Sequence, residues 1–297
     1  MAFVAYLFLV ILAVGTYSHH QHHIYFSSFL FTHYLLFRTA SAAPGSRIVG
    51  GDHVTIQEFP YVLAFTYLYP GPGITVQRCV GSLVSSWHAV TSSFCFTGAI
   101  LNNIQIRAGS TNSLSGGIVV TIADVTKHPD YTEVPRSNDI AVVHFQTPLG
   151  ITNVVNVLFL PPQNFYIEDG QSVKIVSWGF ETENGPQLET LKTVFLNKIS
   201  VAECESAFAD TENTVAISDK VICAQAAGKG MCMGDSGAPM AISNVLIGCS
   251  SFFKDCLSDV YPDVFTRVDR YTNWILDVAV PGTTRQAGII NAPVVAK

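Results

Sequence analysis

The stretch Met233-Gly234-Asp235-Ser236-Gly237-Ala238-Pro239 decides how the whole sequence is interpreted. A Gly-Asp-Ser-Gly motif alone is weak support for any assignment, because so short a pattern recurs by chance. Three further segments accompany it in the chain. They are Arg47-Ile48-Val49-Gly50-Gly51, Asn138-Asp139-Ile140-Ala141, and Pro262-Asp263-Val264-Phe265-Thr266-Arg267-Val268 followed by Trp274-Ile275. Four motifs at wide, ordered intervals make a chance match improbable.

The composition is that of a globular protein and argues against a nucleic-acid partner. Of the 297 residues, 48% are hydrophobic and 13% are charged, which is typical of a chain with a packed core. The formal net charge is -6, and no run of Lys or Arg is present that would follow a phosphate backbone. We therefore expect no binding to nucleic acid.

Residues 1–42 are predicted to be a leader. The run 3–14 (FVAYLFLVILAV) has the length and apolar character of a signal-peptide core, and we expect cleavage after Gly15 or after Ala42. A second apolar stretch, 24–37, follows four histidines that we interpret as part of a solvated linker. Neither run reaches the about 20 residues needed to span a bilayer. The sequence thus predicts secretion and no membrane anchor.

The rest of the chain is predicted to consist mainly of strands. Segments rich in β-branched and aromatic residues are separated by clusters of Gly, Pro, Asn, Asp and Ser. Only 269–279 has helical spacing, with Tyr271, Trp274, Ile275 and Val278 on one face. This pattern favours an all-β barrel or sandwich. The segments expected as strands are 62–67, 104–108, 117–122, 141–145 and 173–176.

The four motifs resemble those of the trypsin/chymotrypsin family of secreted serine proteases, in the family's order and spacing. The resemblance runs from residue 48 to residue 280. It implies two six-stranded antiparallel β-barrels with a short C-terminal helix and an active site between the barrels. By this resemblance, 43–47 is a short activation peptide, 48–280 the peptidase domain and 281–297 a C-terminal tail. The nearest branch is the arthropod chymotrypsin/collagenase-like one.

The resemblance also implies how the protein is activated. Cleavage after Arg47 would free the α-amino group of Ile48, which in the family pairs with the carboxylate that corresponds to Asp235. An unpaired buried carboxylate is unfavourable, so the new ammonium reorganises the loop around it. This movement aims the N–H groups of Gly234 and Ser236 at one point and forms an oxyanion hole.

The histidine of the family's catalytic triad is missing from this sequence. The family carries it directly before the second cysteine of the first disulfide, and here the segment 91–95 reads Thr-Ser-Ser-Phe-Cys, which places Phe94 there. The counterparts of the catalytic aspartate and serine, Asp139 and Ser236, remain. A benzyl group cannot accept a proton, so we expect the serine hydroxyl to be unactivated. His88 would lie about 20 Å away along an extended chain and is not expected to substitute.

Six of the seven cysteines match the disulfides of the family. The implied pairs are Cys79 with Cys95, Cys204 with Cys223, and Cys232 with Cys256. Cys249 is left over and is expected to be a buried free thiol. No Cys or His spacing suits zinc, and 107–123 lacks the carboxylates of the trypsin calcium loop, so no metal and no cofactor are expected.

The resemblance places a substrate pocket near the end of the chain. Gly230 stands where trypsin-like members carry an acidic pocket base, and Asp263 stands on the opposite wall, a combination that looks like the crustacean collagenases. Asp263 could face a Lys or Arg side chain, or it could be a solvated turn residue after Pro262. The segment Ser251-Phe252-Phe253 aligns with the strand that pairs with the substrate backbone. Phe253, where glycine is usual, is expected to crowd the pocket mouth.

The sequence therefore predicts a secreted, monomeric serine-protease homologue that is inactive or severely impaired. Its function would be to bind a peptide or protein, such as an active protease or an inhibitor. One alternative is an active serine endopeptidase in which another group, or a histidine of the substrate, acts as the base. A second is a structural extracellular protein. If only the base is missing, Phe94→His should restore measurable amidase activity.

Overall fold

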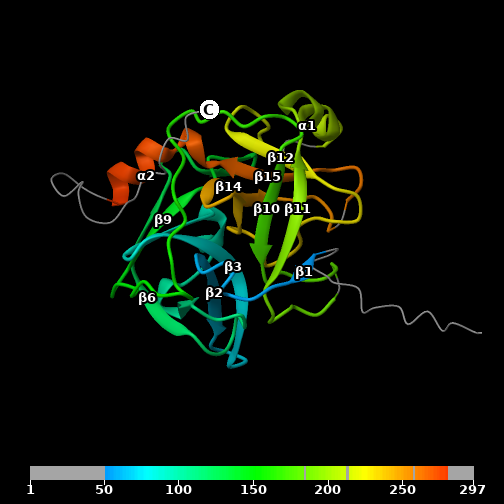
Figure 1. Ribbon diagram of the computed structural model, residues 1–297. Helices are drawn as coiled ribbons and strands as arrows, with labels where there is room; N and C mark the ends of the chain where they lie inside the picture. Colours follow the sequence, from blue (N-terminus) through cyan, green and yellow to red (C-terminus); the bar gives the residue numbers. More distant parts are fainter. Residues whose placement is uncertain (1–50, 184, 212–213, 257, 280–297) are drawn as a thin grey trace, which may run out of the picture. The chain divides into compact units, whose positions relative to one another are not determined.

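Figure 1 shows the structure, a computed structural model that describes residues 51–279 apart from 184, 212–213 and 257. The expected leader, the cleavage site at Arg47 and Ile48, and the tail 281–297 lie outside the described residues. The expectations about them remain predictions.

The first barrel is built by the N-terminal half of the described chain. It closes in the order β2-β3-β4-β9-β6-β5, and every neighbouring pair is antiparallel. In β5, buried residues alternate with exposed or half-buried ones, because successive side chains of a strand point to opposite faces. The six strands are β2 (Val62–Tyr69), β3 (Ile74–Ser85), β4 (His88–Thr91), β5 (Ile104–Ala108), β6 (Ile118–Lys127) and β9 (Ala141–Phe145).

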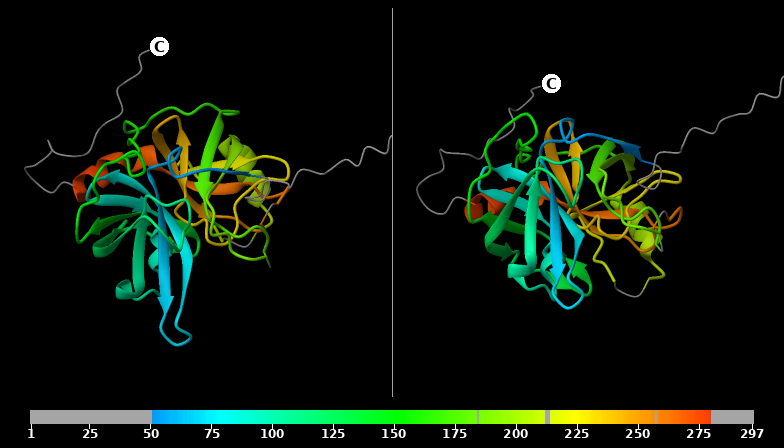
Figure 2. Two further views of the ribbon diagram at one scale, coloured as in Figure 1. Left: turned by 60° about the horizontal axis from the view of Figure 1, so that its bottom comes forward. Right: turned by 90° about the horizontal axis from the view of Figure 1, so that it is seen from below.

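The second barrel follows in the chain and also has six antiparallel strands. The sheet order β11-β10-β13-β14-β15-β12 closes through the pairing of β11 with β12, and β1 (Asp52–His53) pairs with the first two residues of β11. The strands are β10 (Ser172–Ser177), β11 (Lys192–Lys198), β12 (Val221–Gln225), β13 (Pro239–Ile242), β14 (Val245–Phe252) and β15 (Asp263–Arg267). The predicted fold class, two six-stranded barrels, is confirmed. Figure 2 shows the two groups of strands from two further sides.

Helices are few in the described residues. The predicted C-terminal helix is present as α2 (Thr272–Ala279), preceded by a short 3-10 turn, η3 (Val268–Arg270). The prediction that no other segment is helical was wrong, because α1 spans Val201–Phe208. Its signal was in the sequence: the Ser200 side chain accepts from the Glu203 N–H, and the Glu203 carboxylate accepts from the Ser200 N–H, a capping box. No described helix is long and apolar enough to cross a bilayer.

The remaining short elements lie in the connections between strands. They are η1 (Ser93–Phe96), η2 (Leu101–Asn103), and the two-stranded ribbon of β7 (Thr132–Glu133) and β8 (Arg136–Ser137). Both η1 and β8 become important for the candidate site.

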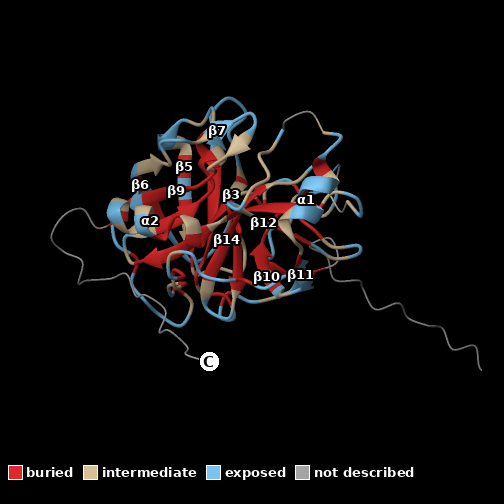
Figure 3. Ribbon diagram, turned by 90° about the horizontal axis from the view of Figure 1, so that it is seen from above, coloured by how far each residue is buried: buried red, intermediate tan, exposed pale blue. Residues whose placement is uncertain are grey.

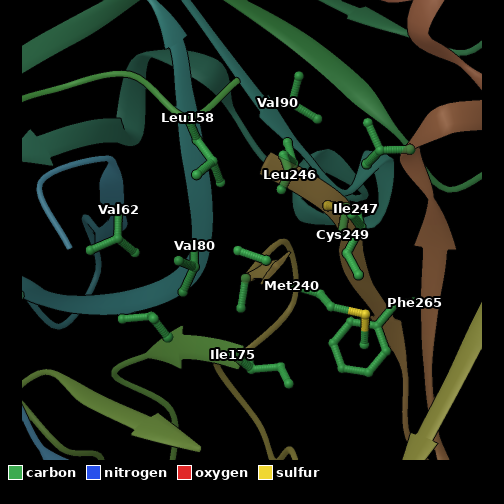
Figure 4. Close-up of a cluster of buried hydrophobic side chains, with 14 of the residues drawn as sticks. Val62, Val80, Val90, Leu158, Ile175, Met240, Leu246, Ile247, Cys249 and Phe265 are labelled. Atoms are coloured by element: carbon green, nitrogen blue, oxygen red, sulfur yellow. The ribbon is translucent and has the colours of Figure 1, made fainter. Parts of the chain in front are cut away.

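The largest apolar cluster takes residues from both barrels. In Figure 4, Val62, Val80 and Val90 of the first barrel are drawn in the same cluster as residues of the second, among them Ile175 and Phe265. A separate cluster fills the first barrel, and a small one lies beneath α1. Figure 3 shows that burial is concentrated in the strands, whereas α1 carries many exposed residues. The shared cluster fixes the two barrels against each other, and the candidate site lies where they meet.

Removal of a side chain from the shared cluster should destabilise the protein strongly. Phe265 on β15 is 0% exposed, so Phe265→Ala should lower the free energy of unfolding by about 3–5 kcal/mol, measured by urea denaturation. The matched control is Phe195→Ala on β11, where the side chain is 47% exposed. Its free energy of unfolding should fall by about 0.5 kcal/mol. Equal losses in the two variants would contradict the assignment of the core.

Candidate active site

The residues predicted for catalysis lie where elements of the two barrels meet. Asp139 directly precedes Ile140 and β9 of the first barrel, and Ser236 lies in the loop before β13 of the second. Ser251 of β14, in the second barrel, donates from its hydroxyl to the Asp139 carboxylate. The N–H of Val80, on β3, donates to the carbonyl of Ser236. Each barrel therefore positions a functional residue of the other.

The Asp139 carboxylate is buried and is surrounded by neutral donors. It accepts from the Ser92 hydroxyl at 2.8 and 2.7 Å, from the Phe94 N–H at 2.9 Å and from the Ser251 hydroxyl at 2.7 Å. Burial raises the pKa of Asp139, and that rise is opposed by the hydrogen bonds from Ser251, Ser92 and the Phe94 N–H and by the positive charge of Arg136. Asn138, with φ of 48°, turns the chain just before the aspartate.

Phe94 lies in η1, directly before Cys95. The turn is capped by Ser92, whose hydroxyl accepts from the Phe94 N–H. The backbone contact to Asp139 is therefore present, while the half-buried ring offers no proton acceptor. The ring is covered by the guanidinium of Arg136, whose central carbon lies 3.8 Å from the ring centre.

Three described histidines, His88, His128 and His144, make ring contacts with residues other than Asp139. The His88 ring stacks on His144 with ring centres 4.9 Å apart, and its Nδ1 shares a hydrogen bond with the Ser85 hydroxyl. Burial, and secondly the neighbouring His144, lower the pKa of His88 to about 4. His128 packs against Tyr271 and Trp274. None of these contacts brings an imidazole to Asp139, in agreement with the expectation for His88.

The nucleophile loop is tightly shaped by its glycines and by Asp235. The buried Asp235 carboxylate accepts from the N–H groups of Gly179 and Cys232 at 2.9 and 2.8 Å, and burial raises its pKa to about 6. Gly237 has φ of 84°, and a Cβ there would lie 2.1 Å from the Val80 carbonyl oxygen. Gly234, with φ of 89°, also needs glycine. Whether the Ile48 ammonium pairs with Asp235 stays a prediction.

Gly230 and Asp263, which the resemblance places in the substrate pocket, are adjacent. Asp263 is only 6% exposed at the start of β15, and its Oδ2 accepts from the Met231 N–H at 2.8 Å. A Cβ on Gly230 would lie 3.1 Å from the same oxygen. The interpretation of Asp263 as a solvated turn residue is therefore wrong. Burial raises its pKa to about 8, so the carboxyl group is largely protonated at neutral pH.

Ser251 and Phe253, both predicted to bind substrate, have different surroundings. Ser251 is buried and holds Asp139, as described above. The Phe253 ring is partly buried and packs against the apolar cluster shared by the barrels. That Phe253 crowds the pocket mouth stays a prediction.

All three expected disulfides are present. Cys79 is bonded to Cys95, Cys204 to Cys223, and Cys232 to Cys256. Cys249 is a buried free thiol, as expected. Among the described residues, no group of three or more His, Cys, Asp or Glu side chains is arranged to hold a metal ion.

Sequence reasoning missed two residues of the site. Ser92 was recognised only as part of a matching segment, although a serine just before a turn is a frequent cap and could have been read as one. Arg136 gave no signal, because its position depends on the fold of the β7–β8 ribbon.

Comparison with known proteins decides the family. A Trypsin family model matches residues 48–275. The chain belongs to the trypsin family. It is 32% identical to alkaline trypsin C and 31% identical to alkaline trypsin B of Manduca sexta over 244 residues, which is 80% of this chain and 94% of each relative.

Two solved structures of the trypsin fold from the scabies mite are also similar. Inactivated protease paralogue S-I1 is 26% identical, with a TM-score of 0.67 over 77% of this chain and 98% of that chain. Inactivated protease paralogue S-D1 shares the fold at 22% identity, with a TM-score of 0.70 over 77% of this chain and 96% of that chain.

The burial of Asp263 predicts how the stability of this trypsin homologue depends on pH. Its pKa is about 8 in the folded protein against 3.8 in the ordinary case, so the folded state binds the proton more tightly. The stabilisation is complete below about pH 4 and is lost as the pH rises toward 8. Asp263→Asn removes this titration, so between pH 5 and pH 8.5 the variant should lose less free energy of unfolding than the wild type.

The control for this measurement is Asp255→Asn, at an exposed carboxylate directly before Cys256. Its pH profile should run parallel to that of the wild type. A parallel profile for Asp263→Asn as well would show that Asp263 is ionised in the folded protein throughout this range.

Proposed function

We propose that this protein is a secreted, non-cleaving trypsin homologue that binds a peptide or protein partner in its cleft. The observation that carries the proposal is the surroundings of the Asp139 carboxylate. Two serine hydroxyls and one backbone N–H are its donors, and the ring of Phe94 takes the place of an imidazole. Among the described residues, the Ser236 hydroxyl then makes no hydrogen bond to a group that can accept its proton.

The loss of the base is large enough to change function. In a serine-histidine-aspartate protease of a different fold, removing the histidine lowers kcat by about 10⁶. The about 10³–10⁴ of rate enhancement over water that survives there comes from the oxyanion hole and from binding. A protein with the same deficit retains a shaped cleft but not a useful rate of proteolysis.

The relatives support two different functions for this protein. The scabies mite paralogue S-I1 is described as an inactivated protease, and at 26% identity it supports a non-cleaving protein here. The alternative, an active endopeptidase of the chymotrypsin/collagenase type, is supported by 32% identity to a moth trypsin. The chemistry at position 94 favours the first.

The ligand that fits the pocket best is a peptide with a Lys or Arg side chain. The Asp263 carboxyl lies beside Gly230, has one N–H donor, and is nearly enclosed. A bound cation favours the ionised carboxylate and so brings its pKa back down. Together with the three disulfides and the apolar run at 3–14, this is consistent with an extracellular partner such as an active protease or an inhibitor.

The wild-type protein should react very slowly with a fluorophosphonate. It is first treated with trypsin, which we expect to cut after Arg47 and to leave Ile48 as the new N-terminus, checked by N-terminal sequencing. Labelling of Ser236 should then be close to that of the control Ser236→Ala, because the hydroxyl is unactivated. Rapid, stoichiometric labelling of the cleaved wild type would establish the active-endopeptidase alternative instead.

A small amidine should report on the pocket. Because Phe253 is expected to crowd the mouth, wild type should bind benzamidine weakly and Phe253→Gly more tightly. In the Phe253→Gly background, Asp263→Asn should weaken binding by about tenfold or more, which corresponds to about 1.4 kcal/mol. Calorimetry gives both constants, and Asp255→Asn is the control. Equal affinity of wild type and Phe253→Gly would show that Phe253 points away from the pocket.

A further inference from the structure

Arg136 is placed in the candidate site by its own backbone. Its N–H donates to the Thr214 carbonyl at 3.0 Å, and its carbonyl accepts from the Ala216 N–H at 2.9 Å. These partners belong to the connection between α1 and β12 of the second barrel, whereas Arg136 itself lies on β8, between β6 and β9 of the first. The backbone of Arg136 is therefore held by its own strand and by a segment of the second barrel.

The side chain of Arg136 contacts aromatic rings and a backbone carbonyl of the candidate site. The central carbon of the guanidinium lies 3.8 Å from the ring centre of Phe94 and 5.9 Å from that of Phe252. Its Nη1 donates to the Ser251 carbonyl at 2.8 Å. A cation over an aromatic face and a charged donor on a carbonyl are both favourable, and more so when shielded from water.

The Ser251 carbonyl is available to Arg136 because of an irregularity in the sheet. In the β14–β15 pairing, Ser250 opposes Phe265 and Phe252 opposes Val264, so Ser251 has no partner in that register. Its hydroxyl holds Asp139 and its carbonyl receives the guanidinium. A peptide that binds beside β14 must therefore compete with Arg136 for the Ser251 carbonyl.

The charge of Arg136 also bears on what a histidine could do at position 94. A base that takes the Ser236 proton must become positively charged, and a cation within about 4 Å disfavours that form. In the reaction with an ester, the Ser236 oxygen bonds to the carbonyl carbon, its proton moves to the imidazole, and the C=O electron pair moves to the oxygen. Arg136 would oppose the proton transfer in that step. An uncharged phenyl ring carries no such conflict.

We propose that Arg136 is a second, independent block on this site, which covers the ring at position 94 and occupies the Ser251 carbonyl. The proposal deepens the proposed function and rests on it. It predicts that Phe94→His alone does not restore a working base, contrary to what the sequence alone implies. Removal of Arg136 then frees the Ser251 carbonyl to accept from a peptide backbone. It also allows an imidazole at position 94 to take up a proton.

The test compares the pKa of the introduced imidazole in two variants by NMR titration. These are Phe94→His and Phe94→His/Arg136→Gln. The pKa should be at least about one unit higher in the double variant, because the neighbouring cation is gone. The control is Phe94→His/Arg107→Gln, where the lost arginine contacts only the Ser113 and Gly116 carbonyls. That variant should shift the pKa by less than about 0.3 units.

Activity gives the second arm of the test. On a small ester substrate, kcat/KM of Phe94→His/Arg136→Gln should exceed that of Phe94→His by at least about tenfold, and Arg136→Gln alone should gain nothing. Equal imidazole pKa values in the first two variants, or equal kcat/KM, would overturn the proposal. The proposed function is judged separately, by fluorophosphonate labelling of the wild type.

A measurement on wild type keeps the proposal falsifiable if the histidine variants do not fold. Protons held over an aromatic face are shifted upfield, so the guanidinium signals of Arg136 should be displaced in wild type and should return to ordinary values in Phe94→Leu. The signals are assigned by their loss in Arg136→Gln. Ordinary guanidinium shifts in wild type would show that the side chain does not cover Phe94.

Discussion

The buried carboxylate of Asp139 is the constraint on which the centre of the molecule depends. A carboxylate is costly to bury unless it is hydrogen-bonded. Here its donors come from both barrels: Ser92 and the Phe94 N–H from one side and Ser251 from the other. The Asp139 carbonyl is also used, since it accepts from the Thr266 hydroxyl of β15. A group usually regarded as catalytic is therefore a structural link between the barrels, which explains how it can remain after the histidine is gone.

The fold was predictable from the sequence because its determinants are local and repeated. Four short motifs indicated the family, and the resemblance to that family implied all three disulfides. The α1 helix was missed, although Ser200 and Glu203 form a capping box, because only Cys204 and Phe208 of its eight residues are buried and the apolar periodicity is weak. Its apolar side chains serve only the small cluster beneath it.

The candidate site was predictable only in part. The absence of the catalytic histidine follows from the single position of Phe94. Asp139 and Ser236 were each identified from the motif around them. The role of Arg136 depends on a ribbon, a loop from the other barrel and a sheet irregularity, none of which has a sequence signature. The state of Asp263 was left open for a similar reason: the same residue after a proline can be solvated or enclosed, and only the packing of β15 decides between them.

The buried thiol of Cys249 has a consequence for how the chain reaches this fold. In the folded protein, burial and then the nearby Asp139 charge raise the pKa of the thiol, which keeps it protonated and unreactive. Before β14 is enclosed, nothing distinguishes it from the other six cysteines. Thiol–disulfide exchange proceeds through the thiolate, so an exposed seventh cysteine can form mispaired intermediates. Enclosure of Cys249 by the second barrel therefore removes a competing thiol from exchange with the three bridges.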